Sequence, residues 1–556
     1  MNRRDFFQKI IHSDAAQAPR VQSGTSLLSP WQPTASNPWD FSAANYLYNR
    51  LGFSARHIEL NAAVSQTPQQ LVETLLDDAL LSSPNLPPPP QDSEIWLQHP
   101  PYVGPDGPIF KIEYSTYQTA KVDLKGDWIR QLAQPVSMLR ERMMLFWANH
   151  FVIGAEKIYP PQMIYKFCDY LRQNPWGNFR QMIKDITIQP AMLIYLDGAW
   201  NEISNINENY ARELLELFTM GRTDKMGVEN YTQKDIRLVA QALVGWRYDN
   251  QTLSPELMPP IFANYYFDFN TKTTPFDAAP KVYGLAQAHR YALFQESLDK
   301  IEGDIIDLIF ERRASEIAYH IVEKIYSEFV YHDTSGIDAK SVIQELADLF
   351  LLSDWELKPM LTKLFESEHF FERTHRGSSI KSPVDLSVGI LRKLDINPTL
   401  SQCCTIRLIC SEMDQEILQP PNVKGWPGYR GWTNSTSLPK RNYAVLRDLI
   451  LNGSIPSRGL SPHTGSPFDA VNWGDQSVLT WATQFSQVNG DYLLFVTQLS
   501  EFLLPLVISS DELTQIATDN GPLHFYEWPS LPDDQRVLII RKVAFALTQL
   551  AEFELQ

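Results

Sequence analysis

Two carboxylates and a guanidinium lie on one predicted helix, residues 209–220, at a spacing that could support chemistry. Glu213 and Glu216 are about one turn apart, and Arg212 can pair with Glu216 at i,i+4. Such carboxylates can bind a divalent metal or transfer protons. The simpler interpretation, which ordinary helices favour, is an amphipathic helix with an internal ion pair. Its buried stripe would consist of Ala211, Leu214, Leu215 and Phe218.

The adjacent residues Asn149 and His150 are the second candidate. Helical periodicity after Ser137, which can cap the helix, places His150 on an apolar face rich in aromatic residues. A neutral histidine there could act as a general base or ligate a metal. Histidines on apolar faces are more often core residues with hydrogen-bonded ring nitrogens. Both interpretations stay open at this point.

A loop rich in Trp, Pro and Gly, residues 422–435, is the third candidate. Its tryptophans offer flat apolar faces beside hydrogen-bonding amides, a combination that suits a sugar or an aromatic ligand. The same tryptophans could instead anchor the loop in a helical core. The candidate binding residues here are Asn422, Trp426, Trp432 and Asn434.

Composition and missing motifs exclude several classes of function. The 65 acidic and 48 basic residues give a formal net charge of −17, which repels nucleic acid. The four cysteines form neither a C-x-x-C pair nor a zinc-type cluster with histidine. No segment has the apolar length of a transmembrane helix, and neither a G-x-S-x-G elbow nor a phosphate-binding glycine loop occurs. We therefore expect no metal, no cofactor and no nucleic-acid partner.

Helix start signals recur along the chain and predict an all-α fold. Thr232 with Asp235 resembles a capping box, and Ser382 with Asp385 repeats the pattern ahead of an apolar stripe. Alternating strand patterns are almost absent. We predict a multi-helix globular domain with long ordered loops, residues 251–280 and the Trp/Pro/Gly-rich 419–438, and a small helical C-terminal region.

The predicted organisation has three parts. Residues 1–40 form a flexible N-terminal arm, residues 41–445 the main helical domain, and residues 446–556 a linker with the helical C-terminal region. The last helix carries an apolar stripe that could dock on a partner helix or close the chain's own core. That stripe consists of Val537, Ile540, Ala544 and Leu547.

The N-terminus looks like a twin-arginine export box, with Arg3-Arg4 followed by Phe6-Phe7. The next residues never become the apolar run that a signal peptide needs. Two interpretations remain. One is export to a bacterial periplasm or cell surface, and the other is a basic leader on a cytoplasmic assembly.

Phrases spread from residue 46 to residue 443 resemble the domain-of-unknown-function 1800 family of large bacterial proteins. The central phrase is NENYARELLELFTMG, residues 207–221. Other matching residues follow the same order as in the family: Arg50-Leu51-Gly52-Phe53, Arg142-Met143, Trp147, Asn149, His150, Gly177-Asn178-Phe179, Pro190-Ala191-Met192-Leu193, Lys381-Ser382-Pro383 and Pro420 to Gly428.

The resemblance implies an all-helical fold with no agreed activity, often with a twin-arginine signal. It also implies a companion protein, which in this family often looks like an alkaline phosphatase or sulfatase. Relatives often carry histidine at four positions that differ here, namely Ala148, Phe218, Phe276 and Arg312. Neither Ala nor Phe can ligate a metal or titrate, so these departures favour a non-catalytic role.

Our leading hypothesis is a non-catalytic helical binding or assembly protein of a bacterial cell-envelope or secreted complex, which could also form a homo-oligomer. The alternative is a metal-assisted hydrolase or transferase that uses His150, Glu213 and Glu216 with a divalent metal. In both cases we expect the polar candidates to converge in one cleft. They are Asn149, His150, Asn207, Glu208, Asn209, Arg212, Glu213, Glu216, Asn422, Trp426, Trp432 and Asn434.

Overall fold

The structure is a computed structural model, and it describes most of the chain. The described residues are 26–82, 103–104, 107–108, 113–158, 161–202, 205–244, 246–248, 260–262, 272–273, 282–283, 299–462 and 464–556. The twin-arginine-like box and Phe276 therefore lie outside the described residues, and so does most of the loop predicted at residues 251–280.

Helices dominate the described residues, which confirms the all-α prediction. The first part of the chain contains α2 (Phe41–Leu51), α3 (His57–Ala63), α4 (Pro68–Leu75), η1 (Asp78–Ser82), α6 (Glu113–Ala133), α7 (Met138–His150), α8 (Pro161–Gln173), α9 (Phe179–Ile188), α10 (Pro190–Tyr195), η2 (Gly198–Trp200), α11 (Asn209–Glu213), the π-helix η3 (Leu214–Thr219) and α12 (Gln233–Ala242).

The remaining helices follow residue 298. They are α14 (Asp299–Arg312), α15 (Ala314–Phe329), α16 (Ile337–Leu352), α17 (Leu357–Phe365), η6 (Arg373–His375), α18 (Pro383–Lys393), α19 (Leu400–Glu412), η7 (Tyr429–Trp432), α20 (Ser437–Lys440), the π-helix η8 (Arg441–Leu451), α21 (Asp475–Ala482), α22 (Tyr492–Leu503), α23 (Ser510–Asn520), η9 (Phe525–Ser530), α24 (Asp533–Thr548) and η10 (Ala551–Glu554).

Strands in the described residues are short and form two-stranded antiparallel pairs. The pairs are β1 (Val103–Gly104) with β2 (Gly107–Pro108), β3 (Trp246–Tyr248) with β4 (Pro260–Phe262), β5 (Lys272–Thr273) with β6 (Val282–Tyr283), and β7 (Ser454–Ile455) with β8 (Val471–Asn472). Ile455 of β7 and Val471 of β8 are buried in the hydrophobic core, and Trp246 of β3 is buried in a second, smaller cluster.

The predicted helix caps are confirmed. Ser137 accepts a hydrogen bond from Arg140 N at the start of α7, and Thr232 with Asp235 forms a capping box at α12. Ser382 with Asp385 forms the equivalent box at α18. These caps satisfy backbone N–H groups that have no partner within the helix, so they fix where each helix begins.

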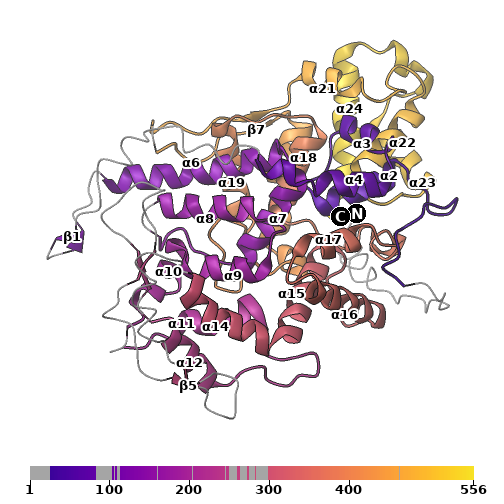
Figure 1. Ribbon diagram of the computed structural model, residues 1–556. Coiled ribbons are helices and arrows are strands. Elements are labelled where there is room, and N and C mark those ends of the chain that lie inside the picture. Colours follow the sequence, from indigo (N-terminus) through magenta and orange to yellow (C-terminus); the bar gives the residue numbers. More distant parts are fainter. Residues whose placement is uncertain are drawn as a thin grey trace.

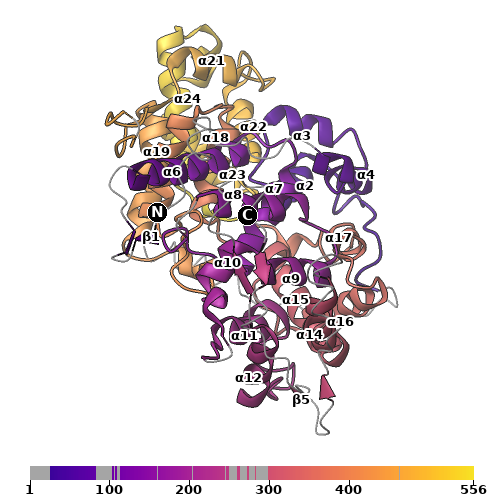
Figure 2. The same ribbon diagram turned by 60° about the vertical axis from the view of Figure 1, so that its left-hand side comes forward.

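One hydrophobic cluster extends through the described chain from Leu28 to Leu555. Helices α21 to α24 gather at one end of the molecule, beside α2 and α3, while α11 and α12 lie toward the other end (Figures 1 and 2). The stripe of α24 closes the chain's own core, because Val537, Ile540, Ala544 and Leu547 are all buried. The region after residue 446 therefore shares its core with the main domain.

Part of the expected N-terminal arm is packed. Leu28 and Trp31 are buried, and the Trp31 ring stacks on Phe371 with centroids 4.2 Å apart. The backbone of Trp31 also donates a hydrogen bond to Glu366 O at 2.7 Å. This packing covers residues 26–40 only, so mobility stays a prediction for the preceding residues.

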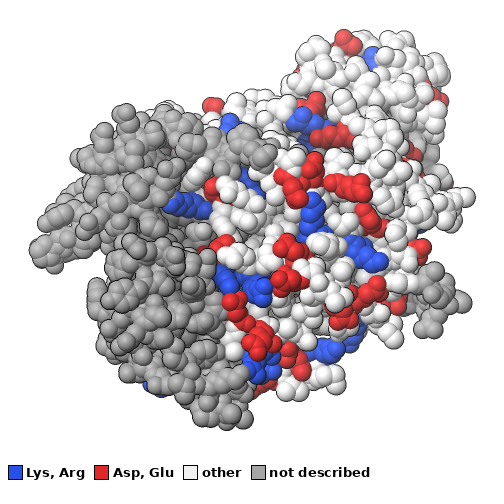
Figure 3. All heavy atoms as spheres, viewed as in Figure 1, with Lys and Arg blue, Asp and Glu red and all other residues white. Residues whose placement is uncertain are grey.

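Acidic and basic side chains are interspersed over the described part of the face shown in Figure 3, and the lobe of α21 to α24 shows few of either kind. The described part of this face lacks the continuous basic patch that is typical of nucleic-acid-binding proteins. No helix in the described ranges combines the length and apolar character needed to span a bilayer.

Candidate functional site

The segment NENYARELLELFTMG, residues 207–221, is the signature phrase of the resemblance described above. It folds into α11 followed by the π-helix η3. Its predicted buried stripe is confirmed, since Ala211, Leu214, Leu215 and Phe218 are buried. Met220 N donates to Leu215 O at 3.3 Å, which is the wider i to i+5 spacing of a π-helix. The last carbonyl groups of such a segment need partners from elsewhere.

His150 and Lys324 supply those partners. Lys324 Nζ donates to Leu217 O at 2.9 Å, and His150 Nε2 lies 3.1 Å from Phe218 O. Lys324 Nζ also lies 3.2 Å from His150 Nδ1. Because an ammonium only donates and a carbonyl only accepts, His150 carries its proton on Nε2.

This arrangement makes His150 a buried core histidine. Burial holds the pKa of His150 well below its usual range, and Lys324 and His320 lower it further. Its unprotonated nitrogen already accepts from Lys324, so no free lone pair remains for a general base or a metal. The side chain instead fixes the end of η3 against α7.

The predicted i,i+4 pair between Arg212 and Glu216 does not form. Arg212 contacts Glu208 at 3.5 Å and Gln233 at 3.1 Å, while Glu216 accepts from Tyr231 Oη at 2.8 Å. The change from α- to π-helix at Leu214 alters the angular spacing, so the i,i+4 geometry no longer aligns the two side chains.

Glu213 has a raised pKa, but among the described residues it belongs to no group of three or more potential metal ligands. Burial raises the pKa of Glu213, Glu216 raises it further, and Arg212 and Lys424 oppose the shift. Among the described residues, the groups of His, Cys, Asp and Glu close enough to share a metal do not include Glu213, Glu216 or His150. The metal-dependent alternative therefore lacks its ligand geometry there.

The candidate asparagines of the signature phrase hold its local backbone. Asn207 Oδ1 accepts from Asn209 N at 3.0 Å, and Asn209 Nδ2 donates to Leu196 O at 3.3 Å. Glu208 accepts from Gln233 Nε2 at 2.5 Å. These contacts orient the start of α11.

The asparagines of the Trp-rich loop also accept hydrogen bonds from nearby backbone N–H groups. Asn422 Oδ1 accepts from Lys424 N at 2.8 Å, and Asn434 Oδ1 accepts from Thr436 N and Ser437 N at 2.9 and 2.8 Å. Both side chains stabilise turns.

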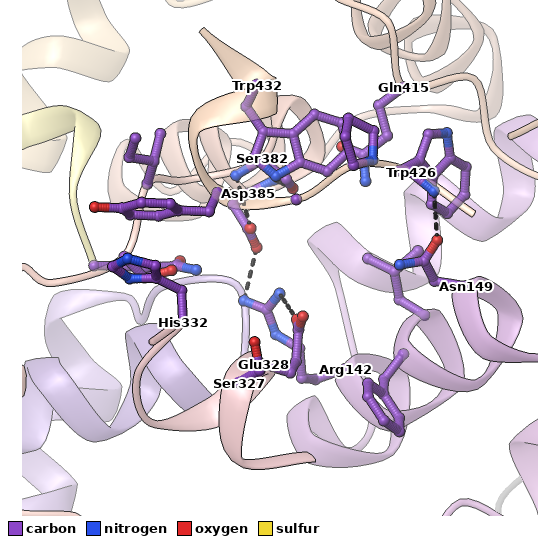
Figure 4. Close-up of a pocket in the computed structure, with 18 residues that line it drawn as sticks. Arg142, Asn149, Ser327, Glu328, His332, Ser382, Asp385, Gln415, Trp426 and Trp432 are labelled. Atoms are coloured by element: carbon purple, nitrogen blue, oxygen red, sulfur yellow. Dashed lines mark hydrogen bonds and ion pairs between the residues drawn. The ribbon is translucent and has the colours of Figure 1, made fainter. Parts of the chain in front are cut away.

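A pocket of about 300 Å³ lies between α7, the end of α15, the start of α18 and the Trp-rich loop (Figure 4). Its wall residues come from segments far apart in the sequence. They are Arg142, Leu145, Phe146, Asn149, Ser327, Glu328, His332, Ser379, Ile380, Ser382, Asp385, Gln415, Trp426, Pro427, Gly428, Tyr429, Trp432 and Gln556.

An ion-paired group forms one side of the pocket. Arg142 Nη2 lies 2.7 Å from Asp385 Oδ1, and Arg142 Nη1 lies 3.8 Å from Glu328 Oε1. Arg142 Nε also donates to Gly52 O at 3.1 Å. Asp385 Oδ2 accepts from Ser382 N at 3.0 Å, so the capping box of α18 holds this carboxylate against Arg142.

Glu328 is the carboxyl group that the pocket leaves accessible. Its side chain is 40 % exposed, whereas those of Arg142 and Asp385 are 3 % and 5 % exposed. Burial raises the pKa of Glu328 above its ordinary value, against the effect of Arg142, and Asp385 adds to the rise. Its carboxylate oxygens can accept hydrogen bonds from a ligand.

Aromatic rings form the other sides, as Figure 4 shows for Trp426, Trp432 and His332. His332 stacks on Tyr429 with centroids 3.5 Å apart and an interplanar angle of 15°. Trp432 and Trp426 are buried among the wall residues.

Close contact with α7 places Trp426. Asn149 Oδ1 accepts from Trp426 N at 2.7 Å. The preceding Gly425 has φ +85°, and a Cβ there would lie 2.2 Å from Asn149 Oδ1. Only glycine allows the loop to approach the helix this closely.

The polar candidates therefore separate into three groups instead of one cleft. Asn149, Trp426 and Trp432 line the pocket. His150 and the signature residues brace η3 and α11, and Asn422 and Asn434 form turns. Sequence reasoning missed Glu328, which lies in the last turn of α15, and His332, which follows that helix, because neither belongs to a motif. The capping box at Asp385 was predicted, but its ion pair with Arg142 depends on the tertiary fold.

Comparison with known proteins identifies one family. Residues 46–522 match the family model described as protein of unknown function (DUF1800). The chain belongs to this family. No curated protein and no solved structure matches the chain. Of the four positions where relatives often have histidine, Ala148 and Phe218 are buried and Arg312 contacts Glu311 at 3.6 Å.

Proposed function

We propose that this protein is a binding protein whose pocket takes a small, uncharged, hydroxyl-rich ring, such as a sugar. The pocket volume of about 300 Å³ lies at the lower end of the range for small-molecule sites, which suits a single ring. Tryptophan and tyrosine rings provide flat surfaces for the apolar face of such a ligand.

Two amide groups supply hydrogen-bond donors. Asn149 uses its oxygen on Trp426 N, and Gln415 uses its oxygen on Val384 N at 2.8 Å. In the described structure neither NH₂ group has a protein partner. Asn149 and Gln415 are thus oriented by the protein and keep donors for ligand hydroxyl groups.

The contacts of the two carboxyl groups in the pocket, Asp385 and Glu328, are the observation that favours binding over hydrolysis. Sugar hydrolysis generally needs two available carboxyl groups on opposite sides of the bond. Asp385 has one oxygen against Arg142 and the other on Ser382 N, so Glu328, which is 3.8 Å from Arg142 and 40 % exposed, is the carboxyl group that a ligand can reach. One free carboxyl group can orient a hydroxyl group but lacks the second partner.

The charges favour a neutral ligand. Asp385 neutralises Arg142, and the guanidinium also donates to the backbone at Gly52. It therefore has little capacity left for an anionic ligand. Glu328 would repel an anion whenever it is ionised.

Quenching or enhancement of tryptophan fluorescence tests the proposal. Neutral monosaccharides, namely glucose, galactose and N-acetylglucosamine, would each be titrated into the full chain, with glucuronate and choline as charged probes. We expect a saturable change with at least one neutral sugar that Trp432→Phe weakens and that Trp200→Phe, at an exposed position outside the pocket, leaves unchanged. Saturation by glucuronate or choline alone, or by none of the probes, contradicts the proposal.

A companion chain, a homo-oligomer and a location in the cell envelope remain part of the proposal. They rest on the family resemblance, and a binding protein in such a complex would present its ligand to a catalytic partner. Co-purification with a companion chain and light scattering would test the complex and the oligomeric state.

A further inference from the structure

A second cluster of polar side chains lies outside the pocket, on the segment between α17 and α18. His369, Glu372 and His375 follow one another at three-residue intervals, and one ligand atom from each lies within 4.8 Å of the others. The histidines are 1 % exposed, and the Glu372 side chain is 15 % exposed. This spacing contains no cysteine and therefore differs from the C-x-x-C patterns of common zinc sites.

His375 has an unpartnered nitrogen in this cluster. Its Nδ1 lies 2.8 Å from His369 O, and because a carbonyl only accepts, Nδ1 carries the proton. Its Nε2 therefore presents a lone pair, yet this buried atom has no hydrogen-bond partner in the structure. A histidine whose Nδ1–H is bound by a backbone carbonyl is oriented as metal-ligating histidines commonly are.

His369 is held in place by contacts at both of its ring nitrogens. Its Nε2 lies 2.8 Å from Tyr326 Oη, and its Nδ1 lies 3.2 Å from Glu372 Oε1. Without a metal, Nδ1–H donates to the Glu372 carboxylate and Nε2 accepts from Tyr326 Oη. A metal that binds at Nδ1 displaces this proton, and Nε2–H can then donate to Tyr326 Oη. The two rings lie with centroids 4.7 Å apart.

We propose that His369 Nδ1, Glu372 and His375 Nε2 form a binding site for a divalent transition metal of the zinc class. Two imidazoles and one carboxylate are a donor set that zinc accepts, with a fourth position left for water on the partly exposed side of Glu372. Calcium and magnesium fit less well, since they prefer oxygen ligands.

Such a metal would stabilise the wall of the pocket. Arg50 Nη2 donates to His375 O at 3.1 Å, to Ser378 Oγ at 2.7 Å and to Val330 O at 2.8 Å. Arg50 thus links the metal-binding segment to Val330, which lies between Glu328 and His332. Its positive charge opposes a cation, which predicts moderate affinity rather than the tight binding of a closed four-ligand site.

Zinc titration of the full chain tests this site. The protein would be stripped with EDTA, and ZnCl₂ binding measured by calorimetry, with Co²⁺ absorption as a spectroscopic check of imidazole ligation. We expect one equivalent per chain, with affinity reduced more than about tenfold in Glu372→Gln and in His375→Gln. His524→Gln, at an exposed position far along the chain, should leave binding unchanged.

Glu372→Gln keeps an oxygen for His369 and lies at a half-buried position, so it decides the question if His375→Gln fails to fold. The assignment is overturned if no stoichiometric Zn²⁺ binding occurs, or if Glu372→Gln binds Zn²⁺ as tightly as the unaltered chain. Sugar binding is measured separately, so the outcome here is distinguishable from failure of the proposed function.

Discussion

The signature helix and the aromatic pocket both concentrate polar residues, but the protein uses them differently. In α11 and η3, Arg212, Glu216 and Asn207 have partners within the protein, and His150 and Lys324 cap the last carbonyl groups. In the pocket, Glu328 remains 40 % exposed. The density of polar residues in a sequence therefore does not show which side chains a ligand could reach, because that depends on the contacts they make in the fold.

The largest effect that tests this comparison should come from the buried ion pair. Arg142→Met leaves Asp385 buried without its partner, which should lower the free energy of unfolding by about 3–5 kcal/mol. Lys157→Met removes the exposed pair with Asp197 and should cost at most about 1 kcal/mol. Urea denaturation measures both, and equal losses would show that the Arg142 pair contributes no special stability.

The second-largest loss of stability should come from disrupting the close contact between the Trp-rich loop and α7. Gly425→Ala combines a positive φ with a Cβ that would lie 2.2 Å from Asn149 Oδ1, so we expect a loss of about 3 kcal/mol. Gly227→Ala has a similar φ, +80°, with nothing within 4 Å of the added Cβ, and should lose only about 1–2 kcal/mol. The same denaturation experiment compares them, and a smaller loss at Gly425 would contradict the close-contact argument.

Removing the cap of η3 should affect stability without affecting the pocket. His150→Phe leaves Phe218 O and Lys324 without one partner each, which should cost about 1–3 kcal/mol. His150→Gln can still donate to Phe218 O and should cost less. Loss of ligand binding in a folded His150→Gln variant would show that His150 acts in function after all.

The smallest of these effects should be the change in the free energy of unfolding that Lys324 causes as the pH rises. Burial lowers its pKa from 10.5 to about 8. Below about pH 8 the lysine is charged in both the folded and the unfolded protein, so the cost of burying the charge fully reduces the free energy of unfolding. As pH rises from about 7 to about 9, the folded state loses the proton first, so stability should increase by about 1 kcal/mol relative to Lys324→Met. Parallel pH profiles for the two proteins would contradict this.

Local signals predicted the helices well because they act within a few residues. The caps at Ser137, Thr232 and Ser382 define helix starts whatever the rest of the chain does. The predicted pair of Arg212 with Glu216 was wrong because the helix changes from α to π at Leu214. The carbonyl groups of that π-helix bind partners such as Lys324, which is more than one hundred residues away in sequence.

The candidate site could be predicted only in part. Asn149, Trp426 and Trp432 were chosen for their chemistry and do line the pocket. Glu328 lies in the last turn of α15 and belongs to no motif, and only the tertiary fold places it beside Arg142 of α7 in the pocket. The histidine and glutamate spacing at residues 369–375 was visible in the sequence, but its burial and hydrogen bonds were not.

Calorimetric titration with the neutral sugar that gives the strongest fluorescence change tests the central claim most directly. Glu328→Gln changes the free carboxyl group of the pocket, and the double variant Glu213→Gln with Glu216→Gln changes the carboxyl groups of the signature helix. We predict that Glu328→Gln weakens sugar binding about tenfold, as loss of a hydrogen bond to a charged group implies, while the double variant binds as the unaltered chain does. Unchanged binding in Glu328→Gln together with lost binding in the folded double variant would contradict the account and place the site at the signature helix.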